Sequence, residues 1–140
     1  VPATLRTLPT IDPNGAVATR NWRFERTNGQ WAINGKFFNP NEIRATPKLN
    51  TSEIWFLRNN SGGWSHPIHI HLEEFRVLEL NEDPVPPGTL VSRKDVIELG
   101  PNTEVKLFMQ FRDWLGKYPM HCHNTIHEDH QMMLRWDVIP

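Results

Sequence analysis

The sequence predicts an all-β protein folded as a Greek-key β-sandwich. Short runs of residues alternate between hydrophobic and polar side chains with a period of two, which is typical of strands buried on one face. The 12 prolines and 8 glycines of the chain interrupt these runs, and helical periodicity is weak throughout. Two packed sheets joined by turns account for all three observations.

The first strands are expected near the start of the chain. Trp22 and Phe24 share one face of an alternating run. Asn-Gly pairs at 28–29 and 34–35 flank the short run 31–33. Because this dipeptide favours the left-handed conformation that tight turns require, we expect hairpins in this region.

Later segments continue the pattern. Prolines at 84, 86 and 87 predict a surface loop over 83–92. Two further runs alternate, at Val105, Leu107, Met109 and Phe111 and then at Leu134, Trp136 and Val138, which face away from Met133, Arg135 and Asp137. Between them, only residues 124–131 are expected to hold a short helical turn.

The length of 140 residues predicts one domain, residues 1–140, which is enough for a two-sheet core. Residues 1–16 are expected to form an arm from a preceding domain. Because the chain begins at Val1 rather than at a methionine, we expect a processed or excised piece, with any signal peptide upstream.

The charge pattern excludes several kinds of partner. The net charge is -1, and the 15 basic and 16 acidic residues are interspersed, so we expect neither a nucleic-acid stripe nor a polybasic membrane patch. Apolar runs such as Ile54 to Leu57 are too short to span a bilayer. A single cysteine allows no intrachain disulfide and does not identify the redox compartment.

Metal-ligating side chains gather in two short strings. Residues 66–71 read HPIHIH, and residues 121–123 read HCH, followed by His127 and Met132. Imidazoles, a thiolate and a thioether suit copper better than calcium, magnesium or a structural zinc ion. The sequence therefore predicts a copper protein.

Strand geometry sorts these ligands into two sets. Side chains on a strand alternate between faces, so Cys122 points away from both of its neighbours in an extended 118–123 segment. By the same parity, His66 lies opposite to His69 and His71. Cys122 and His66 therefore converge on one metal, with His127 and Met132 returned by the following turn. This is the ligand set of a blue-copper centre. The remaining histidines, His69, His71, His121 and His123, form a separate all-imidazole cluster.

The strings HPIHIH and HCHNTIHEDHQMM resemble the C-terminal cupredoxin domain of multicopper oxidases, the family of laccases and bilirubin oxidases. The segments TSEIWFLRN and HPIHIHLEEFRVLEL extend the resemblance over most of the chain from Trp31 onward. It implies a cupredoxin-like sandwich whose cofactors are a type 1 copper, a type 2 copper and a type 3 copper pair. The ligands that it implies are His66, Cys122, His127 and Met132 for type 1, His69 for type 2, and His71, His121 and His123 for type 3.

Other residues near these strings are candidates for supporting roles. Glu128 resembles an acidic position that some family members use for proton relay near the cluster. Asp95 and Asp129 are expected to fix the tautomers of ligand imidazoles. Trp64 resembles the bilirubin oxidase branch and lines the substrate edge of the type 1 site or packs beside the copper. His130 has no role in the pattern and is expected at the surface or behind a ligand.

Some alternatives stay open. Met133 adjoins Met132, and the resemblance favours Met132 because the family places the axial ligand five residues after the type 1 histidine. The string HEDH lacks the HExxH spacing of a metalloprotease. A stand-alone electron-transfer cupredoxin needs only the type 1 set, and a copper-homeostasis protein that oxidises cuprous ion would favour a methionine-rich insert, whereas this chain has 4 methionines.

The resemblance also implies what this chain lacks. The family's trinuclear cluster uses eight histidines, of which this chain matches four. We therefore expect an N-terminal cupredoxin domain, in the same precursor or a companion chain, to supply the others, and we expect the lone domain to be inactive. Dioxygen and a small reducing substrate are the implied reactants, and a periplasmic or secreted location is the family expectation.

Overall fold

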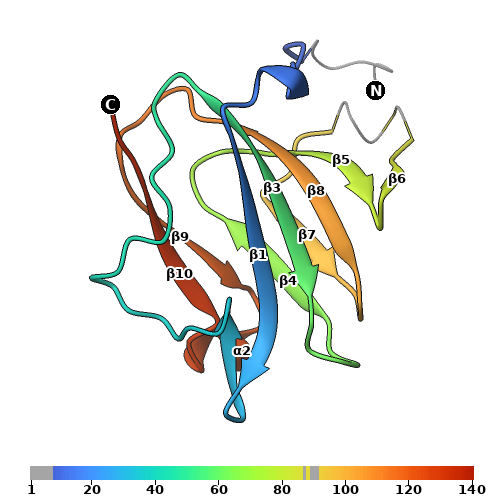
Figure 1. The fold of residues 1–140 in the computed structure, drawn as a ribbon, viewed down its shortest axis with the longest axis vertical. Coiled ribbons are helices and arrows are strands. Elements are labelled where there is room, and N and C mark those ends of the chain that lie inside the picture. The colour runs from blue at the N-terminus through green and yellow to red at the C-terminus, as the bar shows by residue number, and fades with distance from the viewer. Residues whose placement is uncertain (1–7, 87, 89–91) are drawn as a thin grey trace, which may run out of the picture.

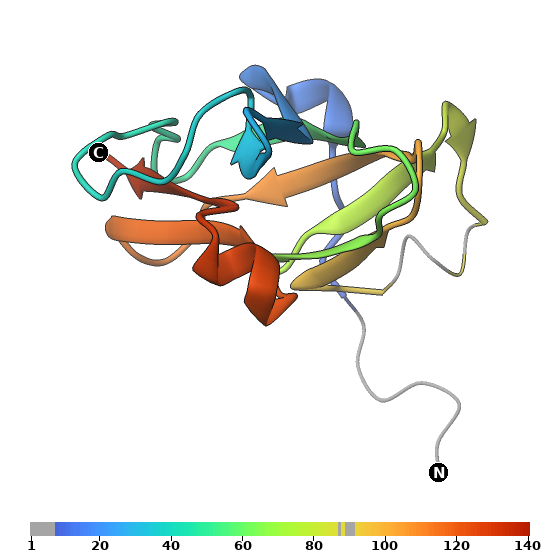
Figure 2. The same ribbon diagram turned by 90° about the horizontal axis from the view of Figure 1, so that it is seen from below.

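The computed structural model describes residues 8–86, 88 and 92–140. Its strands form two sheets that pack face to face, with the larger sheet above the smaller one in Figure 2. The all-β sandwich that the sequence predicts is confirmed.

The larger sheet has the strand order β2-β1-β3-β8-β5-β6. Its strands are β1 (Ala18–Thr27), β2 (Gln30–Ile33), β3 (Ser52–Asn59), β5 (Arg76–Leu80), β6 (Asp83–Pro84) and β8 (Glu104–Gln110). β1 runs parallel to β3, and the other neighbouring strands are antiparallel (Figure 1). A short 3-10 helix, η1 (Pro13–Gly15), precedes β1.

The smaller sheet has the order β10-β9-β4-β7 and is antiparallel throughout. Its strands are β4 (His66–Ile70), β7 (Val96–Leu99), β9 (Gly116–Cys122) and β10 (Met133–Val138). Between β9 and β10 lies α2 (Thr125–Asp129), which begins where the Asn124 side chain accepts a hydrogen bond from the Ile126 amide. This is the short helical turn that the sequence predicts.

The two predicted Asn-Gly turns are confirmed. Asn28 and Gly29 have φ values of 50° and 80° and close the β1–β2 hairpin. Asn34 and Gly35, at φ values of 51° and 70°, close the bridge that follows β2. These turns fix β2 against the end of the sandwich where α2 lies (Figure 1).

The core lies between the two sheets and follows the predicted alternation. β10 buries Leu134, Trp136 and Val138 and leaves Met133, Arg135 and Asp137 half-buried. From the facing sheet, Trp55 contacts Trp136 edge to face, with 5.6 Å between their ring centroids. This packing holds β10, and with it β9, against the larger sheet.

The prediction of a surface loop over residues 83–92 is wrong for its first two residues. Residues 83 and 84 form β6, which pairs with β5. Pro84 is tolerated there because β6 lies at the edge of its sheet, where a missing backbone donor does not interrupt further pairing. Residues 87 and 89–91 of that loop lie outside the described residues, as do residues 1–7 of the expected arm.

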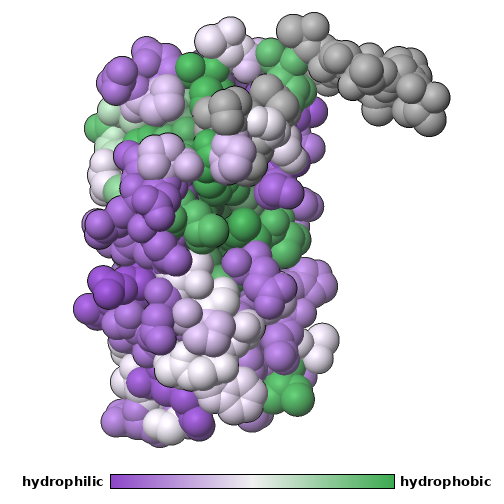
Figure 3. Space-filling view, turned by 90° about the vertical axis from the view of Figure 1, so that its right-hand side faces the viewer, coloured by the Kyte–Doolittle hydropathy of each residue, from purple (hydrophilic) through white to green (hydrophobic). Residues whose placement is uncertain are grey.

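One side of the molecule, on which β6 and β7 lie, is seen in Figure 3. Hydrophobic residues gather in its upper half, and hydrophilic residues cover much of the rest. Within the described ranges, no helix has the length and hydropathy needed to cross a membrane.

Glu53 on β3 anchors a buried ion pair that ties β1 to β3. Its carboxylate accepts hydrogen bonds from Arg20 at 2.6 and 2.8 Å and from the Trp55 indole at 2.8 Å. Glu53→Ala leaves the buried Trp55 indole without its acceptor and Arg20, which is 25% exposed, without its partner, so we expect the free energy of unfolding to fall by about 1–3 kcal/mol. Chemical denaturation measures this loss.

A matched control for that variant lies at the surface of β1. Glu25 lies 3.6 Å from Arg23 in an ion pair whose arginine is 55% exposed. Because exposed pairs contribute little, Glu25→Ala is expected to cost less than about 1 kcal/mol. Equal losses in the two variants would contradict the structural role of Glu53.

Candidate metal centres

β4 and β9 are neighbours in the smaller sheet and carry most of the predicted ligands. In their register, Ile68 faces Cys122 and His69 faces His121. Because paired residues in adjacent strands point to the same face, Cys122 points into the sandwich and His121 points out of it. Burial along β4 alternates accordingly, with His66 on the inner face. The two ligand sets therefore lie on opposite faces of one sheet, as strand parity predicts.

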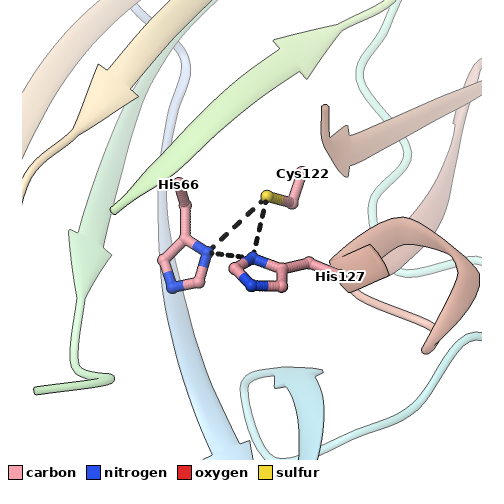
Figure 4. Close-up of side chains that lie close together, drawn as sticks. All are labelled: His66, Cys122 and His127. Atoms are coloured by element: carbon pink, nitrogen blue, oxygen red, sulfur yellow. Dashed lines mark hydrogen bonds between the residues drawn. The ribbon is translucent and has the colours of Figure 1, made fainter. Parts of the chain in front are cut away.

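We call His66, Cys122 and His127 the buried site (Figure 4). The Cys122 Sγ lies 3.6 Å from His66 Nδ1 and 3.5 Å from His127 Nδ1, and the two nitrogens are 3.1 Å apart. Donors about 2.0 Å from a metal ion in a trigonal arrangement are about 3.5 Å from one another. The three atoms are thus spaced to hold one ion.

Burial keeps the groups of this site neutral. Burial, together with a smaller effect of the neighbouring His127, lowers the pKa of His66 to about 4. Burial also lowers the pKa of His127, with smaller effects from His130 and Arg26. Burial raises the pKa of the Cys122 thiol to about 11. A bound cation would supply the positive charge that stabilises the thiolate in this pocket.

The two adjacent methionines face different ligand sets. Met132 is fully buried, its amide donates to the His127 carbonyl at 3.0 Å, and its carbonyl accepts from the Cys122 amide at 3.0 Å. Met133 pairs with His121 in the β9–β10 register and is half-buried. Met132 is therefore the methionine that the backbone joins to both ligand segments of the buried site.

We call His69, His71 and His121 the open cluster. One ring nitrogen from each lies within 4.8 Å of the others, and the Nε2 atoms of His71 and His121 are 3.2 Å apart. The fourth predicted member, His123, is exposed, with ring centroids 5.9 Å from His69 and 5.6 Å from His121. The structure thus brings three of the four imidazoles together and leaves His123 beside them.

Backbone and side-chain oxygens orient the imidazoles of the open cluster. The Nδ1 atom of His69 lies 3.1 Å from the Asp95 carbonyl, and that of His121 lies 3.2 Å from the Cys122 carbonyl and 3.4 Å from the Glu128 carboxylate. An Nδ1–H that donates to oxygen leaves Nε2 as the lone-pair atom. Asp95 makes its hydrogen bond through its carbonyl, because its carboxylate is 3.9 Å away.

Burial also favours the neutral form of His71, the remaining imidazole of the open cluster. It lowers the pKa of His71, and the nearby His69 and His121 add to this effect. Neutral imidazoles are the form that binds metal ions. Asp129, the last residue of α2, and His130, which caps it, are both exposed, so neither side chain lies inside either centre.

Two tryptophans cover the buried site. The Trp31 ring lies 4.0 Å from that of His127 and 5.1 Å from that of His66, and it is 5% exposed. Trp64 is 50% exposed and lies 5.6 Å from His127. The sequence pointed to Trp64 alone, because only the long-range approach of β2 to the loop after β9 places Trp31 here.

Comparison with known proteins shows the family. Residues 10–140 match the family described as multicopper oxidase. The chain is 41% identical over 139 residues to a bilirubin oxidase of Albifimbria verrucaria, covering 95% of this chain and 24% of that protein. It is 38% identical over 123 residues to a multicopper oxidase of Staphylococcus haemolyticus, covering 86% and 27%. The chain belongs to the multicopper oxidase family.

Solved structures support the same conclusion. The McoA multicopper oxidase from Aquifex aeolicus matches with a TM-score of 0.86 and 25% identity, covering 97% of this chain and 32% of that chain. The fold of this multicopper oxidase family member is therefore cupredoxin-like, as predicted. The chain spans about a quarter of the length of the curated relatives given above.

Membership of the multicopper oxidase family implies copper, and the buried site fits that metal. A thiolate and two imidazoles form the trigonal donor set that blue-copper proteins use, and divalent copper binds such sites more tightly than other first-row ions do. In this member of the family, one donor atom each of His66, Cys122 and His127 lies within 4.8 Å of the others.

Proposed function

We propose that this chain is the C-terminal cupredoxin domain of a multicopper oxidase. In this proposal the enzyme oxidises a one-electron donor at a type 1 copper and reduces dioxygen to water at a trinuclear cluster shared with an N-terminal cupredoxin domain. One observation carries it. Cys122 belongs to the buried site, while the residue before it belongs to the open cluster on the opposite face of the sheet.

The ligand assignments follow from the two donor sets. The buried site is assigned to type 1 copper, with Met132 as the axial ligand. His69 is assigned to type 2 copper, and His71, His121 and His123 are assigned to the type 3 pair. When bound, copper ions supply the one-electron redox chemistry and the activation of dioxygen, while the protein supplies geometry, electrostatics and a dry site.

Cys122 provides the path between the two centres. Its side chain lies in the buried site, and its backbone continues through peptide bonds to His121 and His123. The carbonyl of Cys122 also lies 3.2 Å from the Nδ1 atom of His121. Covalent bonds and this hydrogen bond thus join Cys122 Sγ to the open cluster, and they would form the path for electrons between bound copper ions. Trp31 packs against the two imidazoles of the buried site.

Glu128 is our candidate for proton delivery. Each dioxygen needs four electrons and four protons to become two waters, so the open cluster needs a route for protons. The Glu128 carboxylate lies 3.4 Å from His121 Nδ1, and its side chain is 31% exposed. It therefore reaches both the cluster and solvent, which is the placement that a proton relay requires.

The open cluster also supports the proposed partner. His123 is exposed, and His69 and His71 are only half-buried, so this face has room for further imidazoles. We propose that an N-terminal cupredoxin domain, in the same precursor or a companion chain, supplies four histidines there. A periplasmic or secreted location is proposed from the family resemblance.

Oxygen consumption tests the proposed function. The copper-loaded protein, with the N-terminal cupredoxin domain present, is expected to consume dioxygen with a phenolic one-electron donor and to release no hydrogen peroxide. Glu128→Gln removes the proposed proton carrier and is expected to slow turnover while the copper content stays the same. Stoichiometric hydrogen peroxide, or no oxygen uptake with full copper, would overturn the proposal.

The axial ligand gives a separate prediction. Met132→Leu removes a weak thioether donor, so we expect the reduction potential of the type 1 copper to rise while the copper stays bound. Met133→Leu, on the face of the open cluster, is the control and is expected to leave the potential unchanged. Spectroelectrochemical titration measures both, and the reverse pattern would assign the axial role to Met133.

A further inference from the structure

A buried hydrogen-bond chain behind His66 has no part in the mechanism above. The Ser61 Oγ lies 2.7 Å from His66 Nε2 and donates to the Asn59 Oδ1 at 2.6 Å. Asn59, at the end of β3, is fully buried, and Ser61 is half-buried in the loop that leads to β4. This series of hydrogen bonds thus ends at Nε2, the ring nitrogen of His66 that points away from Cys122.

The contacts of Asn59 decide which atom donates in each hydrogen bond between Asn59, Ser61 and His66. The Asn59 side-chain amide donates to the carbonyls of Trp64, Leu99 and Gly100 at 2.6, 3.1 and 2.9 Å. Because carbonyls only accept hydrogen bonds, the Asn59 atom that contacts them is the amide nitrogen. The other polar atom, Oδ1, is therefore an acceptor, and the Ser61 amide donates to it at 3.0 Å. The Asn59 oxygen is therefore the acceptor for the Ser61 hydroxyl as well.

This direction determines the tautomer of His66. The Ser61 hydroxyl gives its one proton to Asn59, so its oxygen accepts from His66, and the Nε2 atom of His66 carries hydrogen. The lone pair then lies on Nδ1, the atom 3.6 Å from Cys122 Sγ. Within the described residues, the ring-nitrogen contacts of His127 are only with His66 and Cys122, so the two imidazoles are held differently.

We propose that Asn59 and Ser61 are positioning residues, which hold His66 in the tautomer that presents Nδ1 to the metal and thereby lower the reduction potential of the bound copper. This inference rests on the proposed function for the choice of copper. An N–H that donates to an oxygen makes the imidazole a stronger electron donor, and a stronger donor stabilises the more highly charged oxidised ion.

The potential of the copper-loaded protein tests this inference. Ser61→Ala removes the acceptor, and we expect the affinity for oxidised copper to fall about tenfold relative to reduced copper, which is a rise of about 59 mV for a one-electron couple. Ser61→Thr keeps the hydroxyl and is expected to restore the original potential. Ser65→Ala, in the same loop, is the matched control and should leave the potential unchanged.

A second readout needs no copper. In the metal-free protein, nitrogen-15 NMR of the imidazoles is expected to show hydrogen on Nε2 of His66 in the original sequence and in Ser61→Thr, and a mixture of tautomers in Ser61→Ala. Hydrogen on Nδ1 of His66 in the original sequence would overturn the inference, even if the alanine variant failed to fold.

The two readouts separate this inference from the proposed function. If the original protein binds copper without the thiolate-to-copper absorption, the proposed function fails, and the NMR result still decides whether Ser61 sets the tautomer. If that absorption is present but Ser61→Ala changes neither the potential nor the tautomer, the positioning role is wrong and the proposed function stands.

Discussion

Cys122→Ser is expected to abolish the intense red absorption of the copper-loaded protein. That band arises from charge transfer between a thiolate and oxidised copper, and a serine hydroxyl does not supply it. Cys122 is the only cysteine in the chain, so no other residue of this chain takes its place. The visible spectrum of the protein, recorded with its copper content, measures the effect.

The same substitution should leave the fold intact. Serine is close to cysteine in size, and the core around the buried site is otherwise unchanged, so the circular dichroism of the two proteins is expected to agree. The copper of the open cluster should also remain, because its imidazoles lie on the other face of the sheet. If the absorption band in the red survives in the serine variant, the assignment of Cys122 to type 1 copper is wrong.

The 140-residue chain on its own is expected to show no oxidase turnover. It contributes His69, His71, His121 and His123 to the proposed cluster, and the structure leaves their outer side open, with His123 exposed. Copper held by half of its ligands should be weakly bound and easily removed by a chelator. Adding an N-terminal cupredoxin domain that brings four more histidines is expected to restore oxygen consumption.

Oxygen electrode traces and copper analysis before and after chelation check this expectation. His69→Ala, tested in the assembled protein, separates damage to the open cluster from damage to the buried site. Oxygen consumption should be lost in this variant, whereas the absorption of the buried site in the red should persist. Robust oxygen reduction by the lone chain, shown to be a monomer, would require a copper centre that these residues do not form.

Much of the candidate site could be predicted from the sequence because it depends on local geometry. Side-chain alternation along β4 and β9 decides which histidines share a face with Cys122, and alternation needs only residue spacing. The return of His127 to the buried site follows from the short helical turn of α2. These features depend on residues close together in the chain.

The remaining features depend on contacts between distant segments. Trp31 covers the buried site because β2 approaches α2, and the Asn59 side chain is held by the Leu99 and Gly100 carbonyls, which lie 40 and 41 residues further along the chain. No period or motif in the sequence encodes such contacts. The short edge strand β6 was missed for a related reason, since prolines indicate loops unless the sheet order places them at an edge.

The position of the two ligand sets on opposite faces of one sheet has a consequence for how such an enzyme diversifies. Trp64 borders the buried site, whereas the open cluster lies on the other face of the sheet, so in the proposed enzyme a substitution near Trp64 that alters the choice of electron donor leaves the histidines of the open cluster untouched. The separation of the two ligand sets is set by the backbone at residues 121–123, which such changes do not alter. If the proposed function holds, donor preference is therefore a trait that directed evolution can alter separately from the reduction of dioxygen.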